Sequence, residues 1–480
     1  QPNHSVNIRS IRTYHLNSKL SLKTCWTNIQ TCLQNDVKDL PECSLPKFKM
    51  YIDENVKPVC QRRYRPSPAA EAEIERQVGN LLEAGLISRS NSPFASPVVL
   101  VRKKAIEGQP LEFRLVIDYR RVNSLDQDLH FDLPLFTDVL EALAEAKNPK
   151  IFSCCDLKSF FHSIPIEESS RRFTAFTVRS GRYHWNRLSM GVKNAPAFVQ
   201  SLMQSLLKSG GEPLNALAFI DDLLLYSPDF NEHCVLIEKI LKLLDSVNLR
   251  LNVHKCYWGQ STVEYLGYKI SAEGIRPTDD KVLAVKTFER PDCPKKLRQF
   301  LGMASFNRRF IPAYAILAAD LYALLEKDAK WHWSDTHEKA FNKIKELLIT
   351  KPVLHHIRPD QPFKILCDAS MKAVGFCIQQ KGDDNMWHPI CYGGSSLPKS
   401  AARSWTAAHC EFHALAKALS QWRHYLGASK HPIIVETDSA NLVSMEKLKM
   451  DGNSRLYRLS LFLQSYKLVF VKKKGAHNLI

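Results

Sequence analysis

Ala218-Phe219-Ile220-Asp221-Asp222-Leu223-Leu224-Leu225-Tyr226 places two adjacent carboxylates between short apolar runs. Runs of this length are typical of buried strands, so the stretch predicts a β-hairpin with Asp221 and Asp222 at or near its tip. Side chains alternate across a strand, and the two acids should therefore not be equivalent. An isolated Asp-Asp pair is more often a solvated turn. A divalent cation is the simplest partner that would stabilise two carboxylates so close together.

The chain is strongly basic. Its 480 residues include 66 Lys and Arg against 49 Asp and Glu, a formal charge of +17. The basic residues form short clusters along the whole length, namely Arg102-Lys103-Lys104, Arg171-Arg172, Arg308-Arg309 and Lys472-Lys473-Lys474. Any one cluster is commonly just a solvated surface. Together they favour a polyanionic partner, with nucleic acid as the first candidate and an affinity that falls as salt rises.

Cysteine use and hydropathy predict a soluble intracellular protein. The thirteen cysteines lack the spacings of zinc sites, and a chain of this length does not need disulfides. No apolar run approaches the roughly 20 residues of a membrane span, and the N-terminus has no signal-peptide core. The first residue is Gln rather than Met, which indicates a processed or excised piece of a longer chain.

Hydrophobic periodicity predicts a mixture of helices and strands. In the first half we expect helices at 70–86 and 195–207, and strands at 98–102, 114–119 and 151–157. Beyond residue 277 the pattern becomes helical. The last part is predicted to be a compact α/β unit, with strands at 363–367, 374–379 and 432–437 around a long helix at 404–426.

A third acid belongs with the hairpin pair, because the predicted strand at 151–157 carries Asp156 at its end. One sheet could place Asp156, Asp221 and Asp222 at a common edge. Three such carboxylates can hold two magnesium ions about 3.5 to 4 Å apart, one activating an attacking hydroxyl and the other neutralising the leaving pyrophosphate. Mg²⁺ suits this arrangement because water and substrate phosphates complete its shell. The predicted chemistry is nucleotidyl transfer.

Six motifs between residues 45 and 271 occur in the order of one enzyme family. They are Asn91-Ser92-Pro93-Phe94-Ala95-Ser96-Pro97-Val98-Val99-Leu100-Val101, Phe113-Arg114-Leu115-Val116-Ile117-Asp118-Tyr119-Arg120-Arg121-Val122-Asn123, Asp156-Leu157-Lys158-Ser159-Phe160-Phe161-His162, Leu188-Ser189-Met190-Gly191-Val192-Lys193-Asn194-Ala195-Pro196, Phe219-Ile220-Asp221-Asp222 and Tyr265-Leu266-Gly267-Tyr268. In these motifs the chain resembles the reverse transcriptase of gypsy-class LTR retrotransposons, and more distantly that of retroviruses. The resemblance makes Asp156 and Asp221 the principal metal ligands and Asp222 a weaker, partly structural third.

The same resemblance implies contacts to the incoming nucleotide. Arg114, with Lys103 or Lys104, would hold its triphosphate, a task that suits a planar guanidinium and a mobile ammonium. The other implied contacts are Phe161 beneath the sugar, where it excludes a 2′-hydroxyl, Met190 beside the nucleotide, and Lys255 behind the palm. Alternatively, Phe161 is an aromatic residue of the core, Met190 fills a gap in the packing, and Lys255 is a surface charge.

A second set of acids lies near the C-terminus. Asp368 and Asp438 end predicted strands, and Glu411 lies within the predicted long helix. This layout resembles that of ribonuclease H, whose carboxylates bind two magnesium ions that activate water against an RNA phosphodiester. The segments Cys367-Asp368-Ala369-Ser370, Thr406-Ala407-Ala408-His409-Cys410-Glu411 and Glu436-Thr437-Asp438-Ser439 resemble the ribonuclease H of the same elements. His409 and His413 are four apart, which could suit a metal, but a packed or solvent-facing pair is the commoner arrangement.

The predicted fold is α+β and multidomain, a right-hand polymerase with fingers, palm and thumb followed by an α/β ribonuclease H-like domain. We expect an N-terminal arm or linker at 1–45, fingers and palm at 46–275, a helical thumb or connection at 276–358, and the ribonuclease H-like domain at 359–480. In the family a fourth Asp follows a segment like Gly475-Ala476-His477-Asn478, after which this chain stops. We therefore expect weak or no RNA cleavage by this polypeptide.

The predicted function is RNA- and DNA-directed DNA polymerisation joined to degradation of RNA in RNA:DNA hybrids. The expected cofactor is Mg²⁺, two ions per site, with Mn²⁺ as an alternative. Expected partners are an RNA or DNA template with an annealed primer, the hybrid, and deoxynucleoside triphosphates, with no membrane and a dimer left open. The expected location is the cytoplasm, in a retrotransposon particle, with the nucleus as an alternative. The rival hypothesis is a non-catalytic or domesticated nucleic-acid-binding or assembly subunit.

Overall fold

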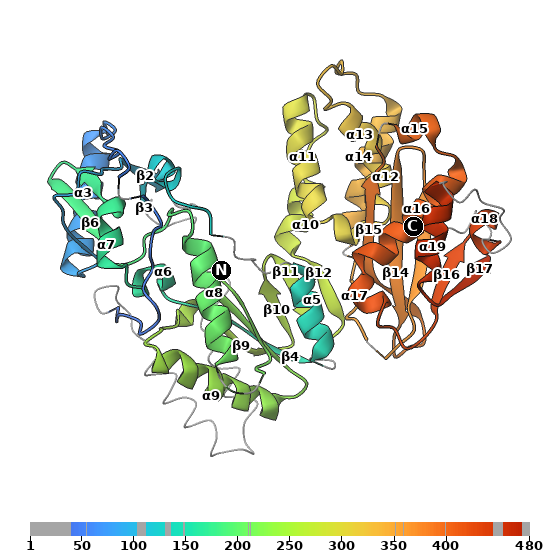
Figure 1. Ribbon diagram of the computed structural model, residues 1–480, viewed down its shortest axis with the longest axis horizontal. Coiled ribbons are helices and arrows are strands. Elements are labelled where there is room, and N and C mark those ends of the chain that lie inside the picture. Colours follow the sequence, from blue (N-terminus) through green and yellow to red (C-terminus); the bar gives the residue numbers. More distant parts are fainter. Residues whose placement is uncertain are drawn as a thin grey trace. The chain divides into compact units, whose positions relative to one another are not determined.

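The computed structural model describes residues 40–53, 55–102, 112–129, 136–146, 149–209, 211, 213–350, 352–358, 360–398, 400–444 and 455–472. The chain divides into two compact units (Figure 1). Unit 1 comprises Gln1–Ala142 and Pro149–Ser261, and unit 2 comprises Leu143–Asn148 and Thr262–Ile480. The domain boundaries expected at 45, 275 and 358 stay predictions. Within the described residues, no helix has both the length and the apolar character to cross a membrane.

Unit 1 contains two small sheets and one larger sheet with their helices. Its elements are α3 (Pro68–Glu83), β1 (Ile87–Arg89), β2 (Val98–Arg102), β3 (Phe113–Ile117), α4 (Arg120–Asn123), β4 (Ile151–Asp156), α6 (Phe160–Ser163), α7 (Glu168–Arg171), β5 (Phe176–Val178), β6 (Gly181–Trp185), α8 (Ala195–Lys208), β7 (Ala216–Phe219), β8 (Asp222–Ser227), α9 (Phe230–Ser246) and β9 (Tyr257–Gln260). Helix α5 (Phe136–Glu145) spans the division between the units. The predicted helices and strands of this half are all present, with ends shifted by a few residues.

The larger sheet of unit 1 has the strand order β7-β8-β4-β9, and every neighbouring pair is antiparallel. Strand β8 lies in its interior, and Leu223, Leu224 and Leu225 are completely buried. A strand covered on both faces needs such a continuous apolar run. Helices α8 and α9 pack against this sheet. The apolar run that follows Asp222 is therefore buried as predicted.

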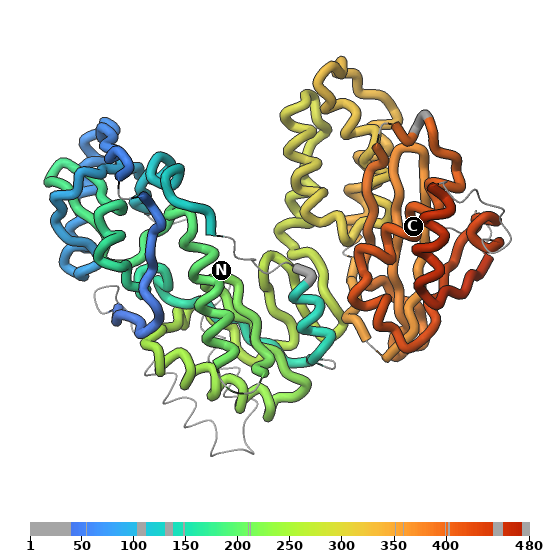
Figure 2. The backbone as a smooth tube through the Cα atoms, viewed as in Figure 1, coloured from blue at the N-terminus to red at the C-terminus, as the bar shows by residue number. Residues whose placement is uncertain are grey.

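The smaller sheets of unit 1 are a β2-β3 hairpin and a three-stranded sheet with the order β1-β6-β5. Helix α3 begins with Ser67, whose hydroxyl accepts the amide hydrogen of Ala70, and with Pro68 in its first turn. Both residues favour a helix start. Residues 40–53 and 55–67 cross this unit largely without helix or strand (Figure 2). Isolated bridges from Phe48 to Ile166 and from Cys60 to Ala95 attach it.

Unit 2 begins with a three-stranded antiparallel sheet and continues with helices and a five-stranded sheet. Its elements are β10 (Thr262–Tyr265), β11 (Tyr268–Ser271), β12 (Gly274–Pro277), α10 (Asp279–Lys286), α11 (Pro294–Phe306), α12 (Tyr314–Leu317), α13 (Ala319–Ala323), α14 (Asp335–Ile349), β13 (Lys364–Ala369), β14 (Ala373–Lys381), β15 (Trp387–Ser396), α15 (Ala401–Ser404), α16 (Ala407–Gln421), α17 (Arg423–Leu426), β16 (Ile433–Thr437), α18 (Ala440–Val443), α19 (Arg455–Gln464) and β17 (Leu468–Lys472). The five-stranded order is β15-β14-β13-β16-β17, antiparallel as far as β13 and parallel beyond it.

The prediction of a single long helix at 404–426 is wrong. The segment forms three helices, α15, α16 and α17, with breaks at Trp405 and Trp422. Trp405 is extended, and Thr406 then starts α16 through a capping box with His409. Apolar periodicity continues through both breaks, so periodicity alone cannot reveal them.

The chain between α14 and β13 is fastened on two sides. Leu354 exchanges two backbone hydrogen bonds with Ile275 of β12, at 2.8 and 2.9 Å, and the His355 amide donates to the Pro389 carbonyl of β15. Gly274 permits the close approach, because a Cβ at this position would lie 2.1 Å from the Leu354 carbonyl oxygen. The segment therefore joins the small sheet β10-β11-β12 to the five-stranded sheet.

Candidate active sites

The hairpin predicted around Asp221 and Asp222 is confirmed. Strands β7 and β8 pair Phe219 with Asp222, which leaves Ile220 and Asp221 as a two-residue loop. Ile220 has a φ of 56°. A β-branched residue at positive φ costs about 1 to 3 kcal/mol and persists only when its surroundings hold it. Such strain often marks a functional site.

Gln200 of α8 holds this loop. Its side chain is 1% exposed. Its Nε2 donates to the Ala218 carbonyl at 2.8 Å, and its Oε1 accepts the Ile220 amide hydrogen at 2.7 Å. A buried amide with both ends satisfied fixes the backbone on either side of the turn. Gln200 is not predicted from the sequence, because a glutamine within an amphipathic helix carries no distinctive signal.

Strand β4 brings Asp156 to the same end of the sheet. Asp156 lies opposite Asp222 in the antiparallel register of β4 and β8. The Leu157 amide also donates to the Asp221 carbonyl at 2.9 Å. The predicted grouping of the three acidic residues at one sheet edge is therefore present. Their assigned roles stay predictions.

The three carboxylates influence one another electrostatically. Burial, together with the negative charges of Asp221 and Asp156, raises the pKa of Asp222 to about 6, against a smaller opposite effect of Lys255. Burial also raises the pKa of Asp221, with a contribution from Asp156. Like charges held together in a partly buried place disfavour ionisation unless a cation compensates them. The site thus favours the binding of positive charge.

Lys255 already supplies one positive charge. Its Nζ lies 3.1 Å from Asp156 Oδ1. The Asn252 amide donates to the Asp156 carbonyl at 2.8 Å, so the turn that carries Lys255 is fastened to β4. The sequence argument placed Lys255 behind the palm as a nucleotide contact. The structure places its ammonium directly on a candidate metal ligand.

The donor set fits a hard divalent cation by its chemistry. Mg²⁺ prefers oxygen ligands and needs only one or two carboxylates from the protein. Across the described ranges, however, no three His, Cys, Asp or Glu side chains are already arranged as a set of metal ligands. The Asp156 carboxylate contacts Lys255 instead. An ion bound here would compete with the lysine for the same oxygen.

The structure places some of the other residues that were predicted to contact the nucleotide. Arg114 of β3 places Nη1 3.9 Å from the Met190 sulfur, so these two are neighbours. Met190 is 43% exposed and open to a ligand. Phe161 is half-buried and packs against the unit 1 core. Lys103 and Lys104 lie outside the described residues.

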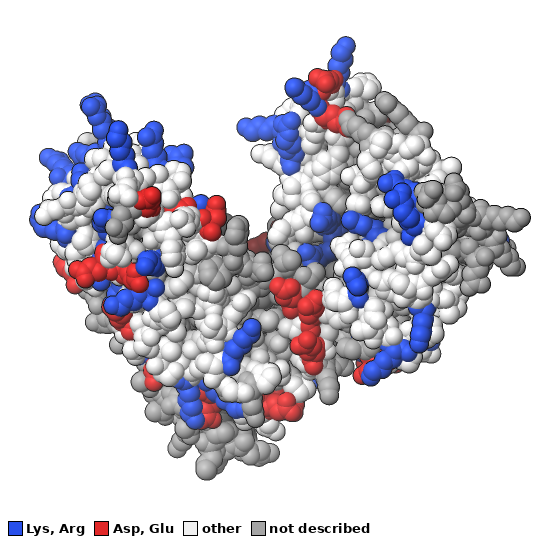
Figure 3. Space-filling model, in the orientation of Figure 1, with Lys and Arg blue, Asp and Glu red and all other residues white. Residues whose placement is uncertain are grey.

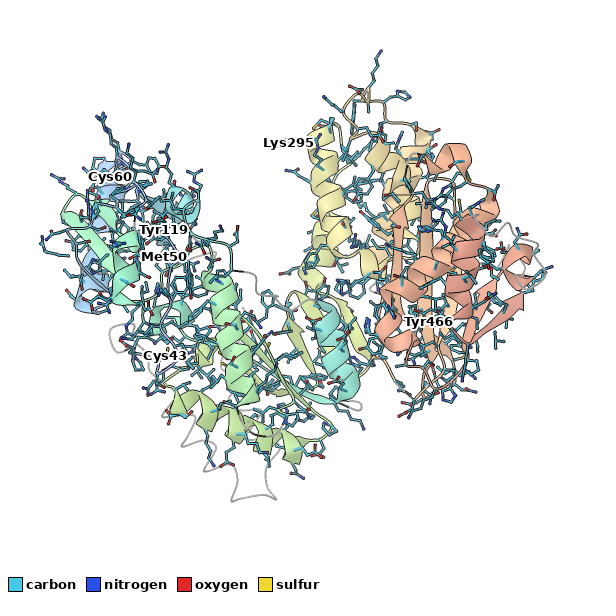
Figure 4. The ribbon with its side chains drawn as sticks, in the orientation of Figure 1. Cys43, Met50, Cys60, Tyr119, Lys295 and Tyr466 are labelled. Atoms are coloured by element: carbon cyan, nitrogen blue, oxygen red, sulfur yellow. The ribbon has the colours of Figure 1, made fainter. Side chains whose placement is uncertain are left out.

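A network of polar contacts shapes the loop that carries Met190. Gly191 has a φ of 93°, and its carbonyl accepts Asn123 Nδ2 at 2.9 Å. The Lys193 amide donates to Asn123 Oδ1 at 3.0 Å. Tyr119 lies inside unit 1 (Figure 4), where its hydroxyl donates to the Thr174 carbonyl at 3.0 Å. The two bonds of Asn123 therefore fasten the loop that carries Met190 to α4.

The second set of acids converges in unit 2. Asp368 lies in β13, Asp438 directly follows β16, and these two strands are parallel neighbours. Burial raises the pKa of Asp368, and the Asp438 charge adds to this. Glu411 of α16 accepts a short hydrogen bond from the hydroxyl of Ser439, the residue after Asp438. The three predicted acids therefore surround one end of the β13-β16 pair.

Two histidines of α16 have separate structural partners. His409 Nδ1 accepts the Thr406 amide hydrogen at 3.2 Å in the capping box. The His413 ring packs edge-on against Trp405 with centroids 5.1 Å apart. The expectation of a packed or solvent-facing pair, rather than a shared metal site, stays a prediction.

The chain matches two family models. Residues 101–270 match reverse transcriptase (RNA-dependent DNA polymerase), and residues 333–435 match an RNase H-like domain found in reverse transcriptase. The chain therefore contains a reverse transcriptase domain followed by an RNase H-like domain. The predicted resemblance is confirmed at this level, and the gypsy class stays a prediction.

Curated relatives support the same assignment. The Transposon Tf2-3 and Tf2-7 polyproteins of Schizosaccharomyces pombe (strain 972 / ATCC 24843) are each 32% identical to this chain over 418 residues. These matches cover 87% of this chain and 31% of each polyprotein. The chain thus spans about a third of the length of these relatives.

Solved structures share the fold. The foamy viral protease-reverse transcriptase dRH in complex with ds DNA has a TM-score of 0.80 at 21% identity, covering 96% of this chain and 80% of that one. The foamy viral protease-reverse transcriptase in complex with RNA/DNA hybrid has a TM-score of 0.73 at 22% identity, covering 96% and 61%. The predicted fold, a right-hand polymerase followed by an RNase H-like domain, is confirmed.

Proposed function

We propose that the chain is an RNA-directed and DNA-directed DNA polymerase that extends a primer by two-metal nucleotidyl transfer. The observation that supports this most directly is the register that sets Asp156 opposite Asp222, beside the strained loop with Asp221. Strand ends fixed by backbone pairing hold charged side chains more precisely than loops do. The confirmed reverse transcriptase domain supplies the reaction class.

The proposed mechanism assigns each residue a task. Asp156, Asp221 and Asp222 would hold Mg²⁺, or Mn²⁺, and such ions activate the primer hydroxyl and neutralise the leaving pyrophosphate. The Arg114 guanidinium binds and orients the triphosphate, since it projects beside exposed Met190. Phe161, five residues after Asp156, excludes a 2′-hydroxyl on the sugar. Gln200 keeps the acidic loop in its strained conformation while substrates exchange.

Basic surface supports template and primer as partners. Lys and Arg side chains gather over α3, β2 and β6 and at α11 (Figure 3). Lys295 projects from the first turn of α11 into solvent (Figure 4). On the same helix Arg298, Gly302 and Phe306 are spaced four residues apart and are all exposed. A basic, a flat and an aromatic position on one helix face suit the sugar-phosphate backbone of a duplex, which is bound by its shape.

Gly302→Ala is expected to stabilise the helix and to weaken duplex binding. An exposed Gly within a helix costs about 0.5 to 1 kcal/mol relative to Ala, and no atom lies within 4 Å of the added methyl, so the variant should unfold at a higher temperature. The methyl would keep a duplex away from the helix, and we expect affinity to fall about tenfold, equal to about 1.4 kcal/mol. Fluorescence anisotropy with a labelled primer-template measures this. Gly79→Ala in α3, where an added methyl likewise meets no atom within 4 Å, is the matched comparison for helix stability, and an unchanged duplex affinity of Gly302→Ala relative to the parent chain would contradict the proposal.

The RNase H-like domain is proposed to cleave the RNA of RNA:DNA hybrids through Asp368, Glu411 and Asp438. We expect the 480-residue polypeptide to cleave this RNA weakly. The reason is that the family's set of metal ligands includes a fourth Asp, which follows the segment like Gly475-Ala476-His477-Asn478. A hybrid with end-labelled RNA measures the rate, and Glu411→Gln should remove the residual cleavage. Cleavage by the parent polypeptide at a rate typical of a complete two-metal enzyme would contradict this expectation.

Primer extension decides between the enzyme and the rival binding or assembly subunit. We expect the chain to extend an annealed DNA primer on an RNA template with Mg²⁺ and deoxynucleotides, and to lose this activity on chelation of the metal. Asp221→Asn is the matched inactive variant. Equal inactivity of both proteins, with duplex binding retained, would select the binding subunit. We also propose that the protein acts in a cytoplasmic retrotransposon particle, or in the nucleus. A dimer is one form in which it would assemble.

A further inference from the structure

Two cysteines face each other directly beneath the first acidic site. Strands β4 and β9 are antiparallel and pair Cys154 with Tyr257, so Cys155 and Cys256 occupy the next opposed positions. The Cys155 thiol donates a hydrogen bond to the Cys256 sulfur. Both belong to the same apolar core, with exposures of 2% and 4%. Opposed residues of an antiparallel pair have Cα atoms about 4.5 to 5.5 Å apart, which lies within the range that a disulfide spans.

This thiol pair adjoins the ion pair of the candidate polymerase site. Cys155 immediately precedes Asp156, and Cys256 immediately follows Lys255, whose ammonium lies 3.1 Å from Asp156 Oδ1. Side chains alternate along a strand, so Cys155 faces the core while Asp156 faces the opposite side. Cys256 is also fastened locally, since its thiol donates to the Asn252 carbonyl at 3.2 Å. Any change in the thiol pair is transmitted to both charged neighbours through a single peptide link.

We propose that Cys155 and Cys256 form a reversible disulfide that switches off the polymerase site. Both S–H bonds break and one S–S bond forms, and two electrons and two protons pass to the oxidant. A low-molecular-weight disulfide takes them up as two thiols, and a diazene such as diamide takes them up as a hydrazine. Reduction by a dithiol reverses the step. The effect on activity rests on the proposed polymerase function, whereas the bond itself does not.

Bond formation changes the geometry of the site. Two sulfurs in hydrogen-bond contact must approach to a bond of about 2.05 Å, with a dihedral angle near 90°. Strand β4 and the turn at 253–256 must shift to allow this. The covalent link also holds the backbones that carry Asp156 and Lys255 close together, which opposes the displacement of the lysine by an ion that binds Asp156. Displacements near an ångström in a catalytic site can reduce rates by about a hundredfold.

Peptide mapping tests the bond in the native protein. After diamide treatment and trypsin digestion without reductant, we expect residues 151–158 and 256–269 as one linked peptide, lighter by two hydrogen atoms than the sum of its parts. Cys154 lies in the same peptide, so Cys154→Ser separates the alternatives. The link should persist in Cys154→Ser and disappear in Cys155→Ala. Absence of the linked peptide, or its loss in Cys154→Ser, would overturn the proposal.

Activity measurements test the switch. Diamide should reduce primer extension of the parent chain by on the order of 10- to 100-fold, and dithiothreitol should restore it. Cys155→Ala and Cys256→Ala should keep their activity in diamide, whereas Cys60→Ala, at an exposed cysteine of the same unit, should lose it like the parent. A linked peptide without loss of activity would refute the switch. Inactivity of the fully reduced parent would instead refute the polymerase proposal, while the mapping still decides whether the bond forms.

Discussion

Asp156→Asn and Asp221→Asn are each expected to reduce primer extension at least about a thousandfold, whereas Asp222→Asn should cost on the order of tenfold. Loss of a metal ligand removes several kcal/mol of transition-state stabilisation, and about 4 kcal/mol corresponds to a thousandfold in rate. Asp222 differs because burial and its two acidic neighbours raise its pKa to about 6. Its ionised form is therefore disfavoured, and loss of its charge should lower the rate less. Single-turnover extension at saturating Mg²⁺ measures the three rates.

Thermal unfolding and duplex binding provide the controls for these variants. Asp221→Asn and Asp222→Asn remove repulsion between buried charges, so neither should lower the unfolding temperature. Binding of a primer-template in the absence of metal should stay unchanged. An equal loss of rate in all three variants would contradict the unequal roles assigned to the acids. A loss of rate accompanied by a lower unfolding temperature would indicate misfolding.

The second large effect is acid destabilisation of unit 1 through His233. This histidine of α9 is fully buried, with Nε2 2.7 Å from Ser153 Oγ and Nδ1 3.1 Å from Ser227 Oγ. Burial lowers its pKa from 6.5 to about 4. Between these values the unfolded chain binds a proton that the folded chain does not. Stability is therefore full above pH 6.5 and is lost as pH falls towards 4, by about 3 kcal/mol at 1.36 kcal/mol per pKa unit.

Urea unfolding at several pH values measures this linkage. His233→Gln should be less stable at neutral pH, because it disturbs the hydrogen bonds to both serines, but its stability should change less between pH 6.5 and 4. His254→Gln, at an exposed histidine of the same unit, should show the parent's pH dependence. Parallel pH curves for the parent and His233→Gln would exclude His233 as the origin of the acid sensitivity.

The parts of the fold that depend on local patterns could be predicted from the sequence. An apolar run on each side of Asp221 and Asp222 was enough to predict the hairpin, and a strand ending in Asp156 was enough to predict that it joins them. Motif order then indicated both domains. These inferences succeed because strand pairing follows burial, and the positions of charges at strand ends follow from the pairing.

The remaining features depend on contacts that no local pattern encodes. Gln200 lies in an ordinary amphipathic helix, and its importance comes only from the turn it reaches, 20 residues later in the chain. The contact of Lys255 with Asp156 spans 99 residues. The break at Trp405 was missed because its neighbours continue the apolar pattern. Long-range partners and capping geometry therefore had to come from the structure.

The double fastening of the segment at 352–358 limits how the chain can be divided. A cut after α14 would leave β12 with an unpaired edge at Ile275 and would leave β15 without its partner at Pro389. Exposed strand edges recruit other chains. A polymerase fragment made by deleting the RNase H-like domain should therefore retain Leu354, which pairs with β12, and shorter fragments should aggregate during purification.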